Sequence, residues 1–238
     1  MAVRNREIGW SPMANALYDV LREFNALKGQ FANTTTTTTT TGLPIGPLTW
    51  MTKNLDSVTY QNGDPIYQVA DISEFLTLTT GAYGYVNNDP STVAEYGLLY
   101  NWYAINDPRN IAPIGFHVAS SYEWGQLIQV VDPSYVPGTP FAPSSYGGDL
   151  KETGLAHWDS PNTNATNTVG FSAIGAGFLG GYVPGVNLFR QAGHYWTADV
   201  WPDDNNYAIY FYFYSSDGNT GSNVQGLNNA CAVRCVKN

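Results

Sequence analysis

The sequence predicts an α+β domain with short strands, two helices and long loops, preceded by an N-terminal helical stalk. Three observations carry this prediction. Apolar residues recur at helical spacing from Met13 to Phe31. A tract of eight Thr residues then occupies positions 34–41. Beyond Trp50, short apolar runs alternate with Gly, Asn, Asp and Pro, which is typical of short strands joined by irregular segments.

The stalk is expected to be a helix over residues 12–30, because Ser11 can cap it and Pro12 fits its first position. Its apolar residues are spaced alternately by three and four positions, a heptad seam that favours a partner helix. We therefore expect self-association through Met13, Leu17, Val20, Phe24, Leu27 and Phe31. The aromatic residues of the seam do not specify how many helices associate, so a dimer and a trimer both stay open. Packing of this helix on its own domain is the alternative interpretation.

The Thr tract divides the chain into three predicted parts. Residues 1–33 are the stalk, residues 34–49 a Thr-rich linker and residues 50–238 the domain. Threonines branched at Cβ disfavour a helix, and the tract has no apolar face to bury, so an extended linker is expected. The alternative is a strand-like collar formed where three copies meet. Turn residues at 42–47 predict the domain boundary.

Four elements stand out in the predicted domain. Helices are expected over 92–104 and over 121–131, where Ser120 or Ser121 can cap and Pro133 stops the pattern. Residues 207–214 alternate as a strand with an apolar face and a face of phenols. Residues 230–236 are expected to pair with that strand as a last strand, after a loop over 215–229.

Composition excludes some function classes. A formal charge of −9 argues against nucleic acid as a partner, since a groove for phosphates needs clustered basic side chains. Residues 1–7 lack the apolar run of a secretory signal, and no stretch is long and apolar enough to insert into a membrane. We expect a protein that is not exported by a signal peptide. Cys231 and Cys235, if they share one strand, lie roughly 13 Å apart, too far for a disulfide.

A series of motifs through the domain resembles a known family. The motifs are WMTKNL at 50–55, NGDPI at 62–66, YGLLYNWYA at 96–104, APIGFHV at 112–118, EW at 123–124, LKETG at 150–154, GFSA at 170–173, YWT at 195–197 and VRCVK at 233–237. Their order is similar to that of the Fibrobacter succinogenes major paralogous domain. The resemblance implies a C-type-lectin-like fold of the formylglycine-generating-enzyme type. It does not cover residues 1–49.

The resemblance also implies a setting. Domains of this kind occur on bacterial surfaces and in bacteriophages, and some relatives are variable proteins of diversity-generating retroelements that bind ligands near the C-terminal end of the domain. Asn codons mutated at their adenines would yield Tyr, Ser, Asp, Ile, Thr and Gly, the composition of residues 199–229. Diversification by a retroelement is therefore a hypothesis that codon identity would decide.

Catalysis is not expected. The fold is shared with enzymes that use a cysteine pair, but Cys235 stands in the VRCV motif, which the resemblance places in a buried strand, and no histidine neighbours either thiol. His117, His157 and His194 lack the spacing of metal ligands and are interpreted as structural. No cofactor is expected. Calcium is an open alternative, because residues 203–206 and 217–219 could supply oxygen ligands.

A binding role is expected for the C-terminal segment, which is rich in Tyr, Ser, Gly and Asn, the residues that binding loops favour. The predicted ligand-binding residues are Asp203, Asp204, Asn205, Asn206, Tyr207, Tyr210, Tyr212, Tyr214, Asn219, Asn223 and Asn228. The alternative is that Tyr210, Tyr212 and Tyr214 merely cover a sheet face.

These observations lead to one preferred functional hypothesis. We expect a non-enzymatic fibre or decoration protein of a tailed bacteriophage, located on the virion. Its stalk would oligomerise or dock on other virion proteins, and its head would bind a bacterial cell-surface glycan or protein. A bacterial surface adhesin and a purely structural capsid or tail component are the alternatives.

Overall fold

The computed structural model describes residues 42–69, 71–180 and 188–238. The predicted stalk helix, its six seam residues and the Thr tract lie outside the described residues. The described strands form three sheets, joined by few and short helices, which confirms the α+β class. The first sheet has the order β1 (Gly42–Ile45), β2 (Leu48–Met51), β11 (Cys235–Lys237) and β6 (Phe116–Val118). The second has the order β10 (Ala230–Cys231), β5 (Leu98–Asn101), β4 (Ala82–Tyr85) and β3 (Tyr67–Gln68), and the third β7 (Ala192–Val200), β8 (Tyr207–Tyr214) and β9 (Thr220–Gly226).

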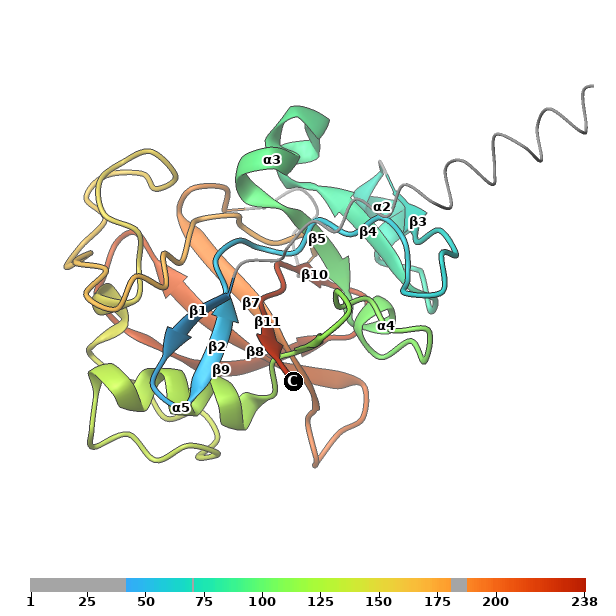
Figure 1. The fold of residues 1–238 in the computed structure, drawn as a ribbon. Coiled ribbons are helices and arrows are strands. Elements are labelled where there is room, and N and C mark those ends of the chain that lie inside the picture. The colour runs from blue at the N-terminus through green and yellow to red at the C-terminus, as the bar shows by residue number, and fades with distance from the viewer. Residues whose placement is uncertain (1–41, 70, 181–187) are drawn as a thin grey trace, which may run out of the picture. The chain divides into compact units, whose positions relative to one another are not determined.

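The domain includes residues that we predicted to be linker. Residues 42–49 form β1 and the start of β2, an antiparallel hairpin in which Ile45 pairs with Leu48. Ile45 is buried and Leu43 and Leu48 pack on the core, so this segment has apolar surface to bury. Trp50 of β2 pairs with Val236 of β11, and Figure 1 shows blue β2 beside red β11. The two ends of the domain therefore meet in one sheet.

The predicted helix over 92–104 is wrong. Helix α3 (Val93–Tyr96) ends at Gly97, β5 follows, and only then does α4 (Trp102–Ile105) begin. Gly97 has a φ of 72°, and a Cβ there would lie 2.7 Å from the carbonyl oxygen of Leu55, so the chain turns where only Gly fits. All four residues of β5 are buried, because the strand lies between β10 and β4. A short strand of mostly apolar residues has no period that separates it from a buried helix.

Helix α5 (Ser121–Val131) has the bounds that the sequence predicts. Ser120 caps it, and a capping box links the Ser120 hydroxyl and the Glu123 carboxylate to each other's backbone N–H groups. Trp124, Leu127 and Ile128 point from this helix into the core. Local chemistry and burial agree here, which is why the sequence alone locates the helix.

The C-terminal segment is arranged differently from the prediction. Strand β8 is confirmed at 207–214, but its neighbours are β7 and β9, and β9 lies inside the stretch predicted as loop. The run at 230–236 divides: β10 pairs with β5, whereas β11 pairs with β2 and β6. The prediction that this run is one strand beside β8 is wrong. Sheet pairing joins residues distant in sequence, so a strand pattern does not name its partner.

Long connections are confirmed by residues 132–191, whose described part contains one short helix, η3 (Gly147–Asp149), and no strand of its own. Buried side chains hold this stretch in place. The Trp158 indole donates to the carbonyl of Ala173 at 2.9 Å, and the ammonium of Lys151 donates to three carbonyls, those of Thr163, Tyr214 and Asp217, at 2.8 to 2.9 Å.

The remaining short helices are α2 (Ile72–Phe75), η1 (Val86–Asn88) and η2 (Pro90–Thr92). None of the helices described is long and apolar enough to cross a membrane.

Candidate functional site

The predicted ligand-binding residues do not form one site. Residues 203–206 lie in the connection between β7 and β8, whereas Asn219 lies in the turn between β8 and β9. Those turns are at opposite ends of an eight-residue strand, roughly 24 Å apart at about 3.4 Å per residue. Tyr210, Tyr212 and Tyr214 lie between them on one face of β8. A small ligand can therefore contact only part of the predicted set.

Asn223 and Asn228 are separate again. Asn223 is exposed on β9, where it pairs with Tyr210. Asn228 is half-buried, and its amide donates to the carbonyl of Leu76. That contact gives Asn228 a role in fastening the chain after β9 to the region of α2.

The end of the β7–β8 hairpin keeps its predicted residues at the surface. Residues 203–206 and Tyr207 are all exposed. The turn is held by a bond from the Trp201 N–H to the carbonyl of Tyr207 at 2.8 Å. The Asp204 carboxylate accepts from the backbone and side-chain nitrogens of Asn206 at 3.0 and 2.8 Å, which orders the tip.

Sequence reasoning missed the aromatic pair beside this tip. The rings of Phe141 and Trp201 meet with centroids 4.8 Å apart, and Phe141 is 46% exposed. Phe141 has a φ of 55°, a left-handed conformation that is uncommon and costly for a bulky residue. Its N–H donates to the hydroxyl of Ser222 in β9 at 3.0 Å, which holds it there. We call Phe141, Trp201, residues 203–206 and Tyr207 the hairpin-end surface.

The phenols of β8 are largely core. Tyr210 is 7% exposed and meets the ring of Trp196 edge-on. His194 of β7 is 3% exposed and stacks between Phe178, at 4.5 Å, and Tyr210, at 4.6 Å. Tyr212 and Tyr214 are half-buried, and burial raises the pKa of all three tyrosines. Tyr210 therefore lies in the core, where a ligand at the surface does not reach it.

Burial of His194 predicts sensitivity to acid. Desolvation lowers the pKa of its imidazole to about 3, and its Nδ1 has no hydrogen-bond partner in the described structure. Between about pH 6.5 and 3 the unfolded chain binds a proton at this residue that the folded chain does not, so stability falls as pH falls. The loss is about 1.4 kcal/mol per pH unit, or roughly 2 to 3 kcal/mol at about pH 4.5. We expect His194→Phe, which keeps the stack but cannot titrate, to lose less stability on acidification.

Urea unfolding of both proteins at about pH 7 and pH 4.5 measures this difference. Carboxylates titrate equally in the two chains, so their contribution cancels in the comparison. Equal losses in wild type and variant would show that His194 is not the acid-sensitive group.

The cysteines and the other histidines are held in structural contacts. Cys231 and Cys235 are free, wholly buried and in different sheets, and burial raises the pKa of both thiols, so thiolates are disfavoured. His117 bonds to Asn238 at 2.7 Å and to Glu123 at 2.8 Å. His157 bonds to Glu152 at 2.7 Å.

In both candidate calcium loops, a carboxylate accepts hydrogen bonds from residues of the same loop. Asp204 accepts from Asn206, and the Asp217 carboxylate accepts from the Asn219 N–H at 2.8 Å. Within residues 42–69, 71–180 and 188–238, no group of three His, Cys, Asp or Glu side chains is arranged to hold a metal ion.

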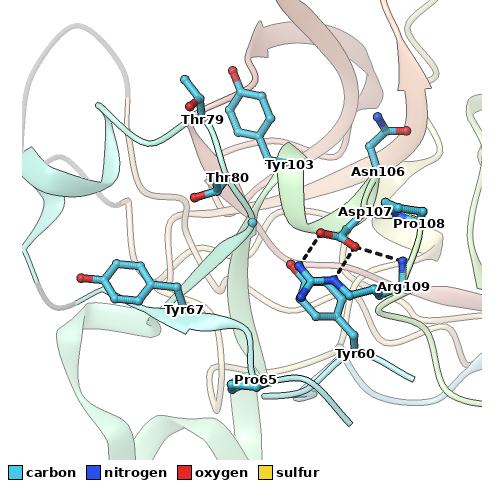
Figure 2. Close-up of a pocket in the computed structure, with 11 residues that line it drawn as sticks. Tyr60, Pro65, Tyr67, Thr79, Thr80, Tyr103, Asn106, Asp107, Pro108 and Arg109 are labelled. Carbon is cyan, nitrogen blue, oxygen red and sulfur yellow. Dashed lines mark hydrogen bonds and ion pairs between the residues drawn. The ribbon is translucent and has the colours of Figure 1, made fainter. Parts of the chain in front are cut away.

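A pocket of about 450 Å³ lies elsewhere, between the segments 60–67, 79–81 and 103–109 (Figure 2). We call it the Tyr60 pocket; its lining is Tyr60, Pro65, Tyr67, Thr79, Thr80, Gly81, Tyr103, Asn106, Asp107, Pro108 and Arg109. Sequence reasoning did not select these residues, although two of the segments overlap family motifs. Nothing in the spacing indicates that they converge.

An ion-pair cluster forms one wall of the Tyr60 pocket. The Arg109 guanidinium binds both oxygens of Asp107, at 2.9 and 2.7 Å, and an oxygen of Asp64 at 3.1 Å. It also covers the Tyr60 ring, with 4.1 Å from Cζ to the ring centroid. The hydrogen bonds from Arg109 lower the pKa of Asp107 to about 2, so that carboxylate is charged at any ordinary pH.

A model of the Fibrobacter succinogenes major domain matches residues 43–237, nearly all of the described domain. No curated protein and no solved structure matches the chain.

Proposed function

The chain belongs to the Fibrobacter succinogenes major domain family, and with that membership as the premise we propose that it is a non-enzymatic virion fibre or decoration protein. Its head, proposed to have a C-type-lectin-like fold, binds a bacterial cell-surface glycan or protein. The contact is made by the hairpin-end surface. Of the predicted ligand-binding residues, this surface keeps only residues 203–207, which are exposed next to one another.

The observation that carries the proposal is the Phe141–Trp201 pair. A bulky residue held at positive φ costs of order 1–3 kcal/mol, and such strain is found where function requires it. Here it places an aromatic ring, 46% exposed, against Trp201 at the edge of an exposed polar tip. Aromatic anchors beside adaptable polar residues such as Asn are common in recognition surfaces.

The state of the thiols and histidines supports a role without catalysis. Buried thiols with raised pKa values are poor nucleophiles, and His194 is enclosed between two rings. A binding role does not require any of these groups to react. Several heads joined through the predicted stalk would add weak contacts into useful avidity, which suits attachment to a cell surface.

The test removes the Phe141 ring without disturbing the backbone. Phe141→Gly relieves the strain, because Gly adopts positive φ freely. This gain offsets the lost contact with Trp201 and the greater freedom of Gly in the unfolded chain, so stability should change by about 1 kcal/mol or less. Binding of the full chain to cells from a panel of bacteria should fall about tenfold or more, as for loss of an interface anchor. Flow cytometry with labelled protein measures binding, and thermal unfolding measures stability.

Tyr146→Ala is the matched control. Tyr146 is 48% exposed, and it lies next to η3, whose Gly147 approaches Asn219 at the far end of the sheet. This variant should bind cells as the wild type does. Unchanged binding by Phe141→Gly would contradict the proposed surface. Failure to bind any bacterium, with tight binding to purified virion proteins, would favour the purely structural alternative.

A further inference from the structure

We propose that the Tyr60 pocket is a second ligand site, one that takes a neutral sugar residue. It shares no residue with the hairpin-end surface, and the inference does not rest on that surface being a contact. The argument has three steps: a neutral buried phenol, a charge balance that disfavours anions, and a lining that suits an amphipathic ring.

The first step is the phenol of Tyr60. This residue is 3% exposed, and burial together with the nearby Asp107 carboxylate raises the pKa of its phenol, so the hydroxyl stays protonated and neutral. Gly81 lies against it: a Cβ there would overlap the hydroxyl and lie 2.9 Å from Ala104 Cα. Gly81 and Tyr60 therefore pack directly on each other and form an uncharged wall of the pocket.

The second step is charge. Arg109 is already bound by Asp107 and Asp64, so one cation faces two carboxylates. The hydroxyl of Tyr67 donates to a further carboxylate, that of Glu74, at 2.8 Å. An anionic ligand would be repelled by this excess of negative charge. The Arg109 guanidinium occupies a face of the Tyr60 ring, 4.1 Å from its centroid, so that face is not available to bind a cationic ligand.

The third step is the lining that stays available. The side chains of Thr79, Thr80, Tyr103 and Asn106 make no hydrogen bond within the described residues, so hydroxyl and amide groups surround the pocket without partners of their own. Tyr67 is 52% exposed and adds an apolar ring (Figure 2). A sugar has C–H faces and hydroxyl edges, which match aromatic rings and neutral polar groups respectively. The volume, about 450 Å³, is that of a small-molecule site.

The experiment uses the full chain against a glycan array, followed by saturation-transfer NMR with the free neutral saccharides that bind. The double variant Tyr103→Phe/Asn106→Ala removes two polar groups that make no internal hydrogen bond, so thermal unfolding should be unchanged. Its affinity for the sugar should fall about tenfold or more. Binding by the wild type should change less than about twofold between roughly 50 and 500 mM NaCl, because a neutral ligand is not screened.

Asn205→Ala is the control, an exposed Asn of the hairpin-end surface. It should bind the sugar as the wild type does. If Asn205→Ala loses sugar binding and the pocket variant keeps it, the sugar binds at the hairpin end: the pocket inference fails and the proposed function stands. No saccharide bound, or a steep salt dependence with acidic or amino sugars alone selected, would also overturn the inference. Loss of cell binding in Phe141→Gly with sugar binding intact would separate the two sites.

Discussion

Replacing Arg234 with Met should destabilise the domain by about 3–5 kcal/mol, because removal of this buried cation leaves its hydrogen-bond acceptors unpaired. Arg234 is 1% exposed and donates to the Asn54 side chain at 2.7 Å. Its other bonds reach the carbonyls of Met51 and Phe171 at 3.1 Å and of Ser172 at 3.0 Å. Met fills a similar volume but satisfies none of these four groups. A loss of this size is a large part of the total stability of a typical domain, about 5–15 kcal/mol.

Arg234 joins three stretches that are far apart in sequence, residues 51–54, residues 171–172 and the C-terminal strand region. Burial lowers the pKa of its guanidinium, yet no carboxylate of the described residues is among its hydrogen-bond partners. The Phe171 ring lies 4.8 Å from its Cζ and adds a cation–π contact. Arg234→Lys keeps the charge but not the planar fork, so it should lose stability to a smaller extent.

Lys237→Met is the control for this prediction. Lys237 lies three positions later, on β11, and is exposed, so its replacement should cost about 0.5 kcal/mol or less. Urea unfolding followed by far-ultraviolet circular dichroism measures both variants. Equal midpoints for Arg234→Met and wild type would refute the assigned role.

Replacing Trp124 with Ala is the second change with a large expected effect, also about 3–5 kcal/mol, from lost burial and the cavity that remains. Trp124 is wholly buried on α5. Its ring lies 5.1 Å from that of Trp50, 5.3 Å from Tyr195, and 5.4 Å from both Phe171 and Phe211. This one side chain therefore packs on β2, on β7 and β8, and on the long connection.

Tyr122→Ala is the matched control, an aromatic residue two positions earlier on the same helix and 55% exposed. It should shift the unfolding midpoint little, as surface substitutions do. Trp124→Phe should lose less than half as much stability as Trp124→Ala, because the Trp124 indole N–H makes no hydrogen bond to the part of the chain that the structure describes. An Ala variant as stable as the Tyr122 control would show that the aromatic cluster tolerates a void at its centre.

Some elements were predictable because neighbours in sequence decide them. Ser120 and Glu123 define the start of α5, since a capping box spans only four positions. The alternation at 207–214 identifies β8 as a strand, because side chains of a strand alternate between two faces. The motifs identified the family from residue order alone, and the match over 43–237 agrees with that.

Other features could not be read from local patterns. Residues 98–101 look helical until β4 and β10 pair with both of their edges, and residues 220–226 look like a loop until β8 pairs with them. The predicted binding residues share a composition but lie at both ends of β8, along it, on β9 and beyond β9. The position of Phe141 beside Trp201 has no sequence signal, since 60 positions separate them.

The sequence by itself determined the mixed class, one helix, one strand and the family. The tertiary structure alone decided which strands pair, which tyrosines are core, and where Arg109, Tyr60 and Gly81 converge on a pocket. The physical reason is the range of the interactions. Caps, turns and alternation act within a few residues, whereas burial and sheet pairing depend on partners that the fold brings together. Whether an exposed residue such as Asn205 shares a surface with an aromatic ring is decided only at that second level.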